Sequence, residues 1–325
     1  MFNKGLGGLL IGVNLLWLTS LYYPMPIWWL DNLFSYPIGL MAFNALLIVI
    51  ALLMSYRVLF VGSTLCALAL IWFIPNSKSE VVLQTQKKGE VSQDQSAAHC
   101  SSSLKIIQFN ALYENTDYNR LLNLLLQEQA DLVVLQEVAP ALEDKLSTLD
   151  DIYPYIYGGK THAKVPSSQF ILSKEVILNF SVKPFTEKNK ILQGDWQITP
   201  QTSLRLIATH LPSPRNSTLW EERNAMLTHV KTLANESEMA NTIVLGDFNL
   251  SSMNARFRSH FEGFETRPVA SWPEWSTHYP TPAFTMISID HLWLKSAQFS
   301  LCSRQGVLPS LGSDHRMIIT KIAQQ

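Results

Sequence analysis

Carboxylate, amide and imidazole side chains recur where apolar, strand-like segments of this chain end. In Thr242–Asn249, a short apolar run is followed by Gly246, Asp247 and Asn249. Such runs are typical of buried strands, and ligand sites in layered α/β folds lie beyond the carboxyl ends of strands. A carboxylate beside a carboxamide supplies a base or metal ligand and a neutral donor for a developing oxyanion. The alternative interpretation is a strand followed by an Asx turn.

The same arrangement recurs at five other places in the chain. The segments are Leu104–Asn110, Asp131–Glu137, Ser203–His210, Ser288–Leu294 and Gly312–Thr320, which carry Asn110, Glu137, His210, Asp290, Asp314 and His315. Taken singly, each residue has a structural explanation as a helix cap, a half-buried histidine or the first residue of a turn. Strands of one sheet bring together ends that are distant in sequence, so the six segments jointly favour one polar site.

Helical patterns lie between these strand-like segments. An apolar face of leucines predicts a helix through Asp117–Gln129, and a second helix is predicted around Thr218–Ala234. Strands interleaved with a few helices indicate a layered α/β or α+β domain with two packed sheets.

The composition limits the classes of function. The 325 residues carry 25 Lys and Arg against 26 Asp and Glu, without the basic stripe that is typical of nucleic-acid binding. The three cysteines, Cys66, Cys100 and Cys302, show neither CxxC nor zinc-ligand spacing, which argues against a cysteine-bound metal.

Three apolar stretches occupy the first quarter of the chain: Leu6–Tyr23, Tyr36–Met54 and Val58–Ile74. Each is near the roughly 20 residues that a helix needs to cross a bilayer, and none contains a charge, so three transmembrane helices are predicted. A cleaved signal peptide is the alternative for the first stretch, but this stretch lacks a small-residue cleavage site and two more stretches follow it.

Charges beside these stretches predict their orientation. Under the positive-inside rule Lys4 and Arg57 lie in the cytoplasm, which places everything after Ile74 outside. The prediction is a multi-pass protein of the cell (inner) membrane, with a membrane domain at 1–75, a flexible polar linker at 76–103 and an extracytoplasmic domain at 104–325. In an oxidising space disulfides persist, so pairing of Cys100 with Cys302 is a hypothesis.

Six sequence motifs carry a resemblance to a known family. IIQFN, DLVVLQE, ATHLPSP, IVLGDFN, SIDHLWL and GSDHR follow one another between Leu104 and the C-terminus. In this order they resemble the endonuclease/exonuclease/phosphatase superfamily, which includes pancreatic deoxyribonuclease, neutral sphingomyelinases and inositol polyphosphate phosphatases. The resemblance implies a four-layer α/β sandwich and metal-dependent hydrolysis of phosphoesters. Three apolar stretches before such a domain resemble a bacterial membrane-bound subgroup that includes teicoplanin-resistance-associated proteins.

The resemblance also implies roles for the polar residues at the strand ends. Glu137 matches the principal metal ligand, with Asn110 and Asp314 on the metal side. A hard oxygen ligand with few protein partners suits Mg²⁺, with Mn²⁺ as the alternative. Asp247 matches the residue that orients or deprotonates the attacking water, and Asn249 the donor to the transition-state oxygens.

Two histidines complete the implied site. His315, hydrogen-bonded to Asp290, would form the second half of the phosphate site, because a buried Asp fixes the tautomer and favours imidazolium. His210 fits the branch of the family that includes pancreatic deoxyribonuclease, in which this histidine is the general acid.

The function predicted from these observations is a membrane-anchored hydrolase of phosphoester or pyrophosphate bonds. Its partners would be the lipid bilayer and a membrane-associated substrate such as a lipid pyrophosphate, and no obligate protein partner is evident. One alternative is a surface nuclease acting on DNA or RNA. A non-enzymatic, membrane-tethered binding module is a second alternative, against which the joint presence of the site residues argues.

Overall fold

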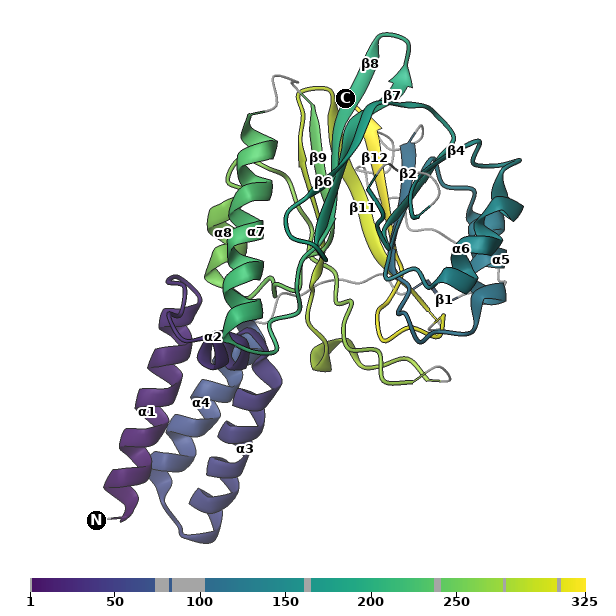
Figure 1. Cartoon of the computed structure of the whole chain (residues 1–325). Coiled ribbons are helices and arrows are strands. Elements are labelled where there is room, and N and C mark those ends of the chain that lie inside the picture. The colour runs from purple at the N-terminus through teal and green to yellow at the C-terminus, as the bar shows by residue number, and fades with distance from the viewer. Residues whose placement is uncertain are drawn as a thin grey trace.

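The structure, a computed structural model, describes residues 2–73, 82–83, 103–160, 165–236, 241–276, 279–308 and 311–325. In these residues two β-sheets pack face to face with helices on both outer faces, and a bundle of helices projects from one end (Figure 1). The predicted α/β sandwich of two packed sheets is confirmed.

The two sheets are both mixed. The seven-stranded sheet has the order β1 (Val82–Leu83), β11 (Phe299–Leu308), β12 (Ile318–Gln324), β2 (Ser103–Asn110), β3 (Leu132–Gln136), β5 (Phe170–Ser173) and β4 (Tyr155–Gly158). The five-stranded sheet has the order β10 (Asp290–Lys295), β9 (Thr242–Asp247), β8 (Thr202–His210), β7 (Lys190–Thr199) and β6 (Ile177–Pro184). Strands β2 and β3 are parallel, as are β8 and β9, so their carboxyl ends point the same way.

Apolar side chains fill the spaces on both sides of each sheet. Between the sheets lie Ile106, Val134, Leu206, Leu245 and Leu292, all fully buried. Helices α5 (Tyr118–Glu128) and α6 (Pro140–Leu146), followed by the 3₁₀ turn η2 (Ser147–Leu149), cover the larger sheet. Helices α7 (Ser217–Asn235) and α8 (Ala255–His260) cover the smaller one. The layers therefore run helix, sheet, sheet, helix.

Two features of local sequence explain where these helices form. The leucines that predict the first helix are all buried on the inner face of α5. Asn216 caps α7, since its side chain accepts a hydrogen bond from the backbone N–H of Leu219 at 2.9 Å.

The N-terminal region consists of α1 (Phe2–Ser20), α2 (Trp28–Ser35), α3 (Pro37–Leu53) and α4 (Arg57–Phe73). Helices α1, α3 and α4 form the projecting bundle, and the short α2 lies across the end of this bundle, under α7 (Figure 1). Among the described residues, no single helix has both the length and the apolarity needed to span a bilayer; α2 and α3 together meet the test, but as a pair bent by 75°.

The stretch predicted as a linker, 76–103, contains the short strand β1, which pairs in parallel with β11 at the edge of the larger sheet. Cys302 is disulfide-bonded and Cys66 is free. The hypothesis that Cys302 pairs with Cys100 concerns a position outside the described residues.

Candidate active site

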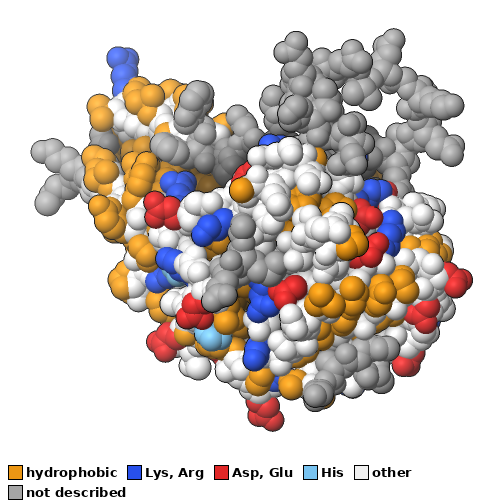
Figure 2. Space-filling model, turned by 90° about the horizontal axis from the view of Figure 1, so that it is seen from above, with side chains coloured by type: hydrophobic (Ala, Val, Ile, Leu, Met, Phe, Trp, Pro, Cys, Tyr) orange, Lys and Arg blue, Asp and Glu red, His pale blue; other side chains and the backbone are white. Residues whose placement is uncertain are grey.

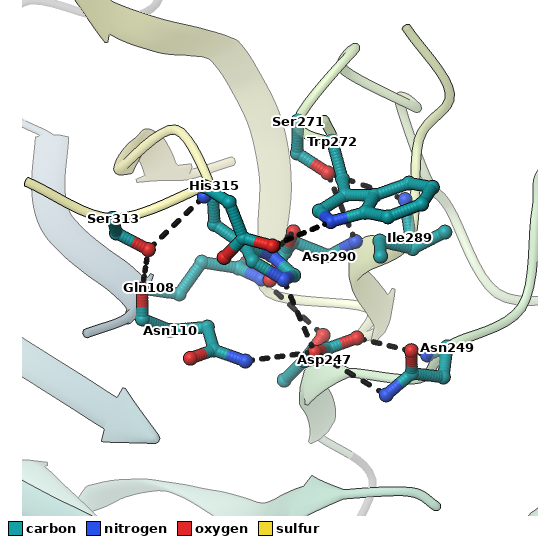
Figure 3. A network of polar contacts seen from close by, with 12 residues as sticks. Gln108, Asn110, Asp247, Asn249, Ser271, Trp272, Ile289, Asp290, Ser313 and His315 are labelled. Carbon is teal, nitrogen blue, oxygen red and sulfur yellow. Dashed lines mark hydrogen bonds and ion pairs between the residues drawn. The ribbon is translucent and has the colours of Figure 1, made fainter. Parts of the chain in front are cut away.

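The strand register brings the predicted polar residues to one edge of the sandwich. In the smaller sheet, Asp247 is the direct neighbour of His210 on one side and of Asp290 on the other. In the larger sheet, Asn110 pairs with Gln136, the residue before Glu137. Because both sheets end at the same edge, side chains from strands far apart in sequence face one another (Figure 3).

The backbone around these residues adopts uncommon conformations. Glu137 and Asn249 lie in the left-handed region, with φ of 50° and 46°, where non-glycine residues cost about 1–3 kcal/mol. Gly246 has a φ of 142° and passes close to the backbone of β8. The turn that carries Asp247 and Asn249 therefore depends on a glycine at this position.

Replacing Gly246 with Ala is expected to destabilise the folded protein by at least about 3 kcal/mol, since an added Cβ would lie 1.8 Å from the carbonyl oxygen of Thr209. Gly263 is a matched control, because it also has a positive φ, of 81°, but an added Cβ there meets nothing within 4 Å. Chemical denaturation of both variants measures the difference. Equal destabilisation would show that the close approach at Gly246 is unimportant.

Asp247 lies at the centre of the polar network (Figure 3) and is 1% exposed. Its Oδ1 accepts a hydrogen bond from the backbone N–H of Asn249 at 2.9 Å, and its Oδ2 accepts one from Nδ2 of Asn110 at 3.0 Å. The same Oδ2 lies 3.6 Å from Nε2 of His210 and 3.7 Å from Nε2 of His315. These contacts fix the carboxylate in one orientation, between two histidines.

His315 and Asp290 form a buried pair behind Asp247. Nδ1 of His315 lies 2.8 Å from Oδ2 of Asp290. Burial opposes a charge on His315, but Asp290 and Asp247 outweigh it and raise the pKa of His315 to about 10. Burial alone would raise the pKa of Asp290, yet His315 holds it below its ordinary value. At neutral pH the pair is therefore an imidazolium donating to a carboxylate.

Asp247 has a raised pKa. Burial, together with the neighbouring Asp290, raises it to about 6, against the opposing effects of His315 and His210. A carboxylate with a pKa just below the working pH is ionised and still able to accept a proton, which suits a general base.

The donor set at this edge fits a divalent cation. Oxygen and nitrogen atoms of Glu137, His210 and Asp247 lie within 4.8 Å of one another. Nδ2 of Asn110 donates to Oε1 of Glu137 at 2.9 Å as well as to Asp247, and so holds the two carboxylates side by side. Like charges held together favour a bound cation, and carboxylate oxygens are the ligands of hard ions such as Mg²⁺.

A cavity of about 450 Å³ opens onto these groups. Its walls include Glu137, Asp247, Asn249, Asp314 and His315. A substrate in this cavity would meet a base, hydrogen-bond donors and an imidazolium at once, which is the equipment for attack of water on a phosphoryl group.

The sequence profile of the Endonuclease/Exonuclease/phosphatase family matches residues 107–315, more than half of the chain. The chain belongs to this family. As a member it is a metal-dependent phosphoesterase, so the predicted family and the predicted class of enzyme are both confirmed. No curated protein matches the chain in sequence.

Several solved structures share the fold of this chain. TDP2 of D. rerio, complexed with a single-strand DNA product, is 22% identical with a TM-score of 0.56, over 68% of this chain and 99% of that chain. An endonuclease/exonuclease/phosphatase from Beutenbergia cavernae is 16% identical with a TM-score of 0.53, over 68% and 72%. The human Nocturnin catalytic domain with bound sulfate is 16% identical with a TM-score of 0.51, over 69% and 94%. At these identities the likeness establishes the fold.

Two of the residues assigned to the metal by the family resemblance have other partners here. Asn110 turns its NH₂ group toward the carboxylates, while its Oδ1 accepts a hydrogen bond from the backbone N–H of Leu112 at 3.1 Å. Asp314 lines the cavity, but its Oδ2 accepts from the indole N–H of Trp272 at 2.9 Å. Among the described residues two groups could hold a metal, Glu137 with His210 and Asp247, and Asp247 with Asp290 and His315, and Asp314 belongs to neither. Their roles as metal ligands stay predictions.

Several residues that line the cavity were not predicted from the sequence. They include Arg223 of α7 and, in and beside α2, Asn32, Ser35 and Tyr36. One signal was present in the sequence. Asp31 is the only charged residue between Lys4 and Arg57, and a lone carboxylate in an apolar region indicates a buried partner.

Proposed function

We propose that this protein is a membrane-anchored, divalent-metal-dependent hydrolase of phosphoester or pyrophosphate bonds that acts on a membrane-associated substrate. The observation that carries the hydrolase function is the convergence of Glu137, Asp247 and the His315–Asp290 pair on one cavity.

Each residue of the site has a chemical task. Glu137 would hold the cation, which when bound would supply polarisation of a phosphoryl oxygen, and this leaves Asp247 and His210 for proton transfer. Asp247 orients a water molecule and accepts its proton as the water attacks phosphorus. The imidazolium of His315 stabilises the negative charge that develops on the phosphoryl oxygens. The amide of Asn249 donates to the carbonyl oxygen of Leu211 at 2.9 Å, so its role as a donor to these oxygens stays a prediction.

His210 is placed to act on the leaving group. Its Nε2 lies 3.5 Å from Oε1 of Glu137 and 3.6 Å from Oδ2 of Asp247, and His210 lines a neighbouring hollow that shares Glu137 with the cavity. A protonated imidazole there donates its proton to the leaving oxygen, as a general acid.

The rate of hydrolysis is expected to depend on pH in two steps. It rises as pH is raised through about 6, because Asp247 must lose its proton to act as a base. It falls as pH is raised through about 10, because His315 then loses the positive charge that stabilises the transition state. A bound cation would move the rising limb to lower pH. The diagnostic measurement is therefore the alkaline limb of kcat/KM, which reports the free protein and which His315→Gln should remove; an unchanged limb would assign it to another group.

Two observations support membrane anchoring and an extracytoplasmic site. The outer faces of α1, α3 and α4 present apolar side chains that are half or more exposed: Leu9, Ile11, Leu15, Leu46, Leu52, Val58, Val61 and Leu65. Surfaces of this kind mark contact with lipid or with another protein. The disulfide of Cys302 is typical of an oxidising compartment.

A nuclease is the second candidate, because TDP2 of D. rerio has been solved with a single-strand DNA product. Polyanion binding relies on many Lys and Arg contacts to phosphates. The chain carries a net charge of −1, and on the face shown in Figure 2 charged side chains of both signs are interspersed. The charge distribution therefore favours a substrate with few phosphates.

The test compares two substrates in one experiment. Full-length protein in liposomes, with Mg²⁺, receives hexadecyl pyrophosphate in the bilayer and plasmid DNA in solution. The expected result is release of inorganic phosphate from the lipid. Rapid DNA cleavage without phosphate release would make the protein a surface nuclease, and inactivity toward both substrates would favour a binding module.

A further inference from the structure

The cavity at the active site is closed on one side by the N-terminal region. Asn32 and Ser35 of α2, with the following Tyr36, line it together with Asp247 and His315 of the sandwich. Residues more than 200 positions apart in the chain thus share one cavity. The helix is a wall of the site as well as a part of the N-terminal bundle.

A buried ionic contact holds α2 in this position. Asp31 is 3% exposed, and its two oxygens accept hydrogen bonds from Trp220 (2.8 Å), Arg223 (3.0 Å), Asn254 (3.0 Å) and Arg256 (3.0 Å). Arg223 also donates through Nη1 to the carbonyl oxygen of Asn249 at 2.9 Å. A chain of direct contacts therefore links α2 to the turn that carries the proposed base.

The neighbours of Asp31 make further contacts with the sandwich. Nδ2 of Asn32 donates to the carbonyl oxygen of Pro214 at 2.7 Å, and Ser35 accepts from Asn254 at 3.0 Å. The hydroxyl of Tyr36 donates to the carbonyl oxygen of Thr285 at 2.8 Å. These contacts reach three separate segments of the sandwich domain, so α2 and Tyr36 are held in a fixed position against it.

The wall beside Tyr36 is apolar. The rings of Tyr36 and Trp272 lie 6.4 Å apart between centroids, and Ile287 and Ile289 line the cavity beside them. The segment Trp28–Tyr36 contains no Lys or Arg, so this side of the cavity offers no cation to a second phosphate of a polynucleotide. Arg215 and Arg223 line the cavity on the sandwich side, and Arg223 is paired with Asp31. Beyond this wall lie α1, α3 and α4 with their exposed apolar faces.

We propose that the apolar side of the cavity, formed by Tyr36, Trp272 and Ile287, is a substrate subsite that α2 closes and that Asp31 holds against the sandwich, and that this subsite binds the apolar chain of an amphipathic phosphoester or pyrophosphate. The inference rests on the proposed hydrolase function and adds the class of substrate. The phosphoryl group lies among Glu137, Asp247 and His315, and the chain leaves between Tyr36 and Trp272 toward the N-terminal helices.

The experiment uses two substrates with the same reacting group, hexadecyl pyrophosphate and methyl pyrophosphate, and full-length protein in detergent micelles with Mg²⁺. Tyr36→Ala is expected to lower kcat/KM for the hexadecyl ester about tenfold or more, while kcat/KM for the methyl ester stays within about twofold. Ser35→Leu, which narrows the subsite from α2, is expected to do the same. Leu33→Ala is the matched control, because Leu33 lies on α2 but is 49% exposed and does not line the cavity.

The outcomes separate the subsite from the hydrolase function. If the Tyr36 and Ser35 variants lose activity equally toward both esters, or toward neither, the subsite is wrong and the hydrolase function stands. If the wild-type protein releases phosphate from neither ester, pyrophosphate is the wrong reacting group for this site and the subsite proposal fails with it. Asp31→Asn tests the positioning role: KM for the hexadecyl ester should rise several-fold more than KM for the methyl ester, and an equal change in both would contradict it.

Discussion

Replacing Asp247 with Asn is expected to lower kcat by at least about a hundredfold, the lower range for losing a general base. The carboxylate is the group that Asn110 and the Asn249 backbone hold toward the cavity, and Asn cannot accept the proton of the attacking water. The measurement is phosphate release from hexadecyl pyrophosphate at saturating Mg²⁺.

Stability distinguishes this effect from unfolding. Burial and Asp290 raise the pKa of Asp247 to about 6, above its ordinary value. A carboxyl group whose pKa is higher in the folded protein than in the unfolded chain destabilises the fold as pH rises from the unfolded pKa through the folded pKa. The reason is that the ionised form is favoured in the unfolded chain. Asp247→Asn removes this cost and also the carboxylate that helps to raise the pKa of His315, so Tm at pH 8 is measured beside kcat to show that the variant is folded. Near-wild-type kcat in the folded variant would remove Asp247 from the mechanism.

Replacing Glu137 with Gln is expected to raise the Mg²⁺ concentration for half-maximal activity by at least about tenfold. Glu137 is the more exposed of the two carboxylates in the cluster with His210, and the variant loses one anionic ligand of a weakly bound hard ion. Its amide keeps the size of the side chain, so the fold should persist. Titration of activity with Mg²⁺ measures the change.

Glu143→Gln provides a control for nonspecific loss of negative charge, because Glu143 lies on α6, outside the cluster. Its Mg²⁺ titration should match that of the wild-type protein. A Glu137→Gln titration that also matched would assign the cation to other ligands, and Asp314 would then be the first to examine.

The strand ends explain why so much of the site was predictable from sequence. Short apolar runs identify buried strands, and the residues that follow them must emerge at the sheet edge, as Asp247 and Glu137 do. The direct pairing of Asp247 with His210 and Asp290 required the strand order, which propensity does not determine. The motif resemblance implied the sandwich and the site residues, and the structure supplies the strand order.

The N-terminal wall of the site was not predictable in the same way. The apolar stretches predict helices, and the structure has helices there. Trp28–Ser35 lies between the first two stretches, where the sequence predicts no helix, and it forms α2. The contacts of Asp31 with Arg223 and Arg256 join segments about 190 and 225 positions apart, and neither arginine follows a recognisable motif. Only the isolation of Asp31 among apolar residues marked this contact in the sequence.

Metal-dependent hydrolysis at the cavity is tested most directly by one measurement: phosphate release from hexadecyl pyrophosphate by the full-length protein, after chelation of divalent ions and again after addition of Mg²⁺. The predicted result is loss of activity on chelation and its recovery with Mg²⁺ in the wild-type protein, with no recovery in Asp247→Asn. Activity that survives chelation, or that Asp247→Asn recovers to the wild-type level, would contradict the assignment of this site.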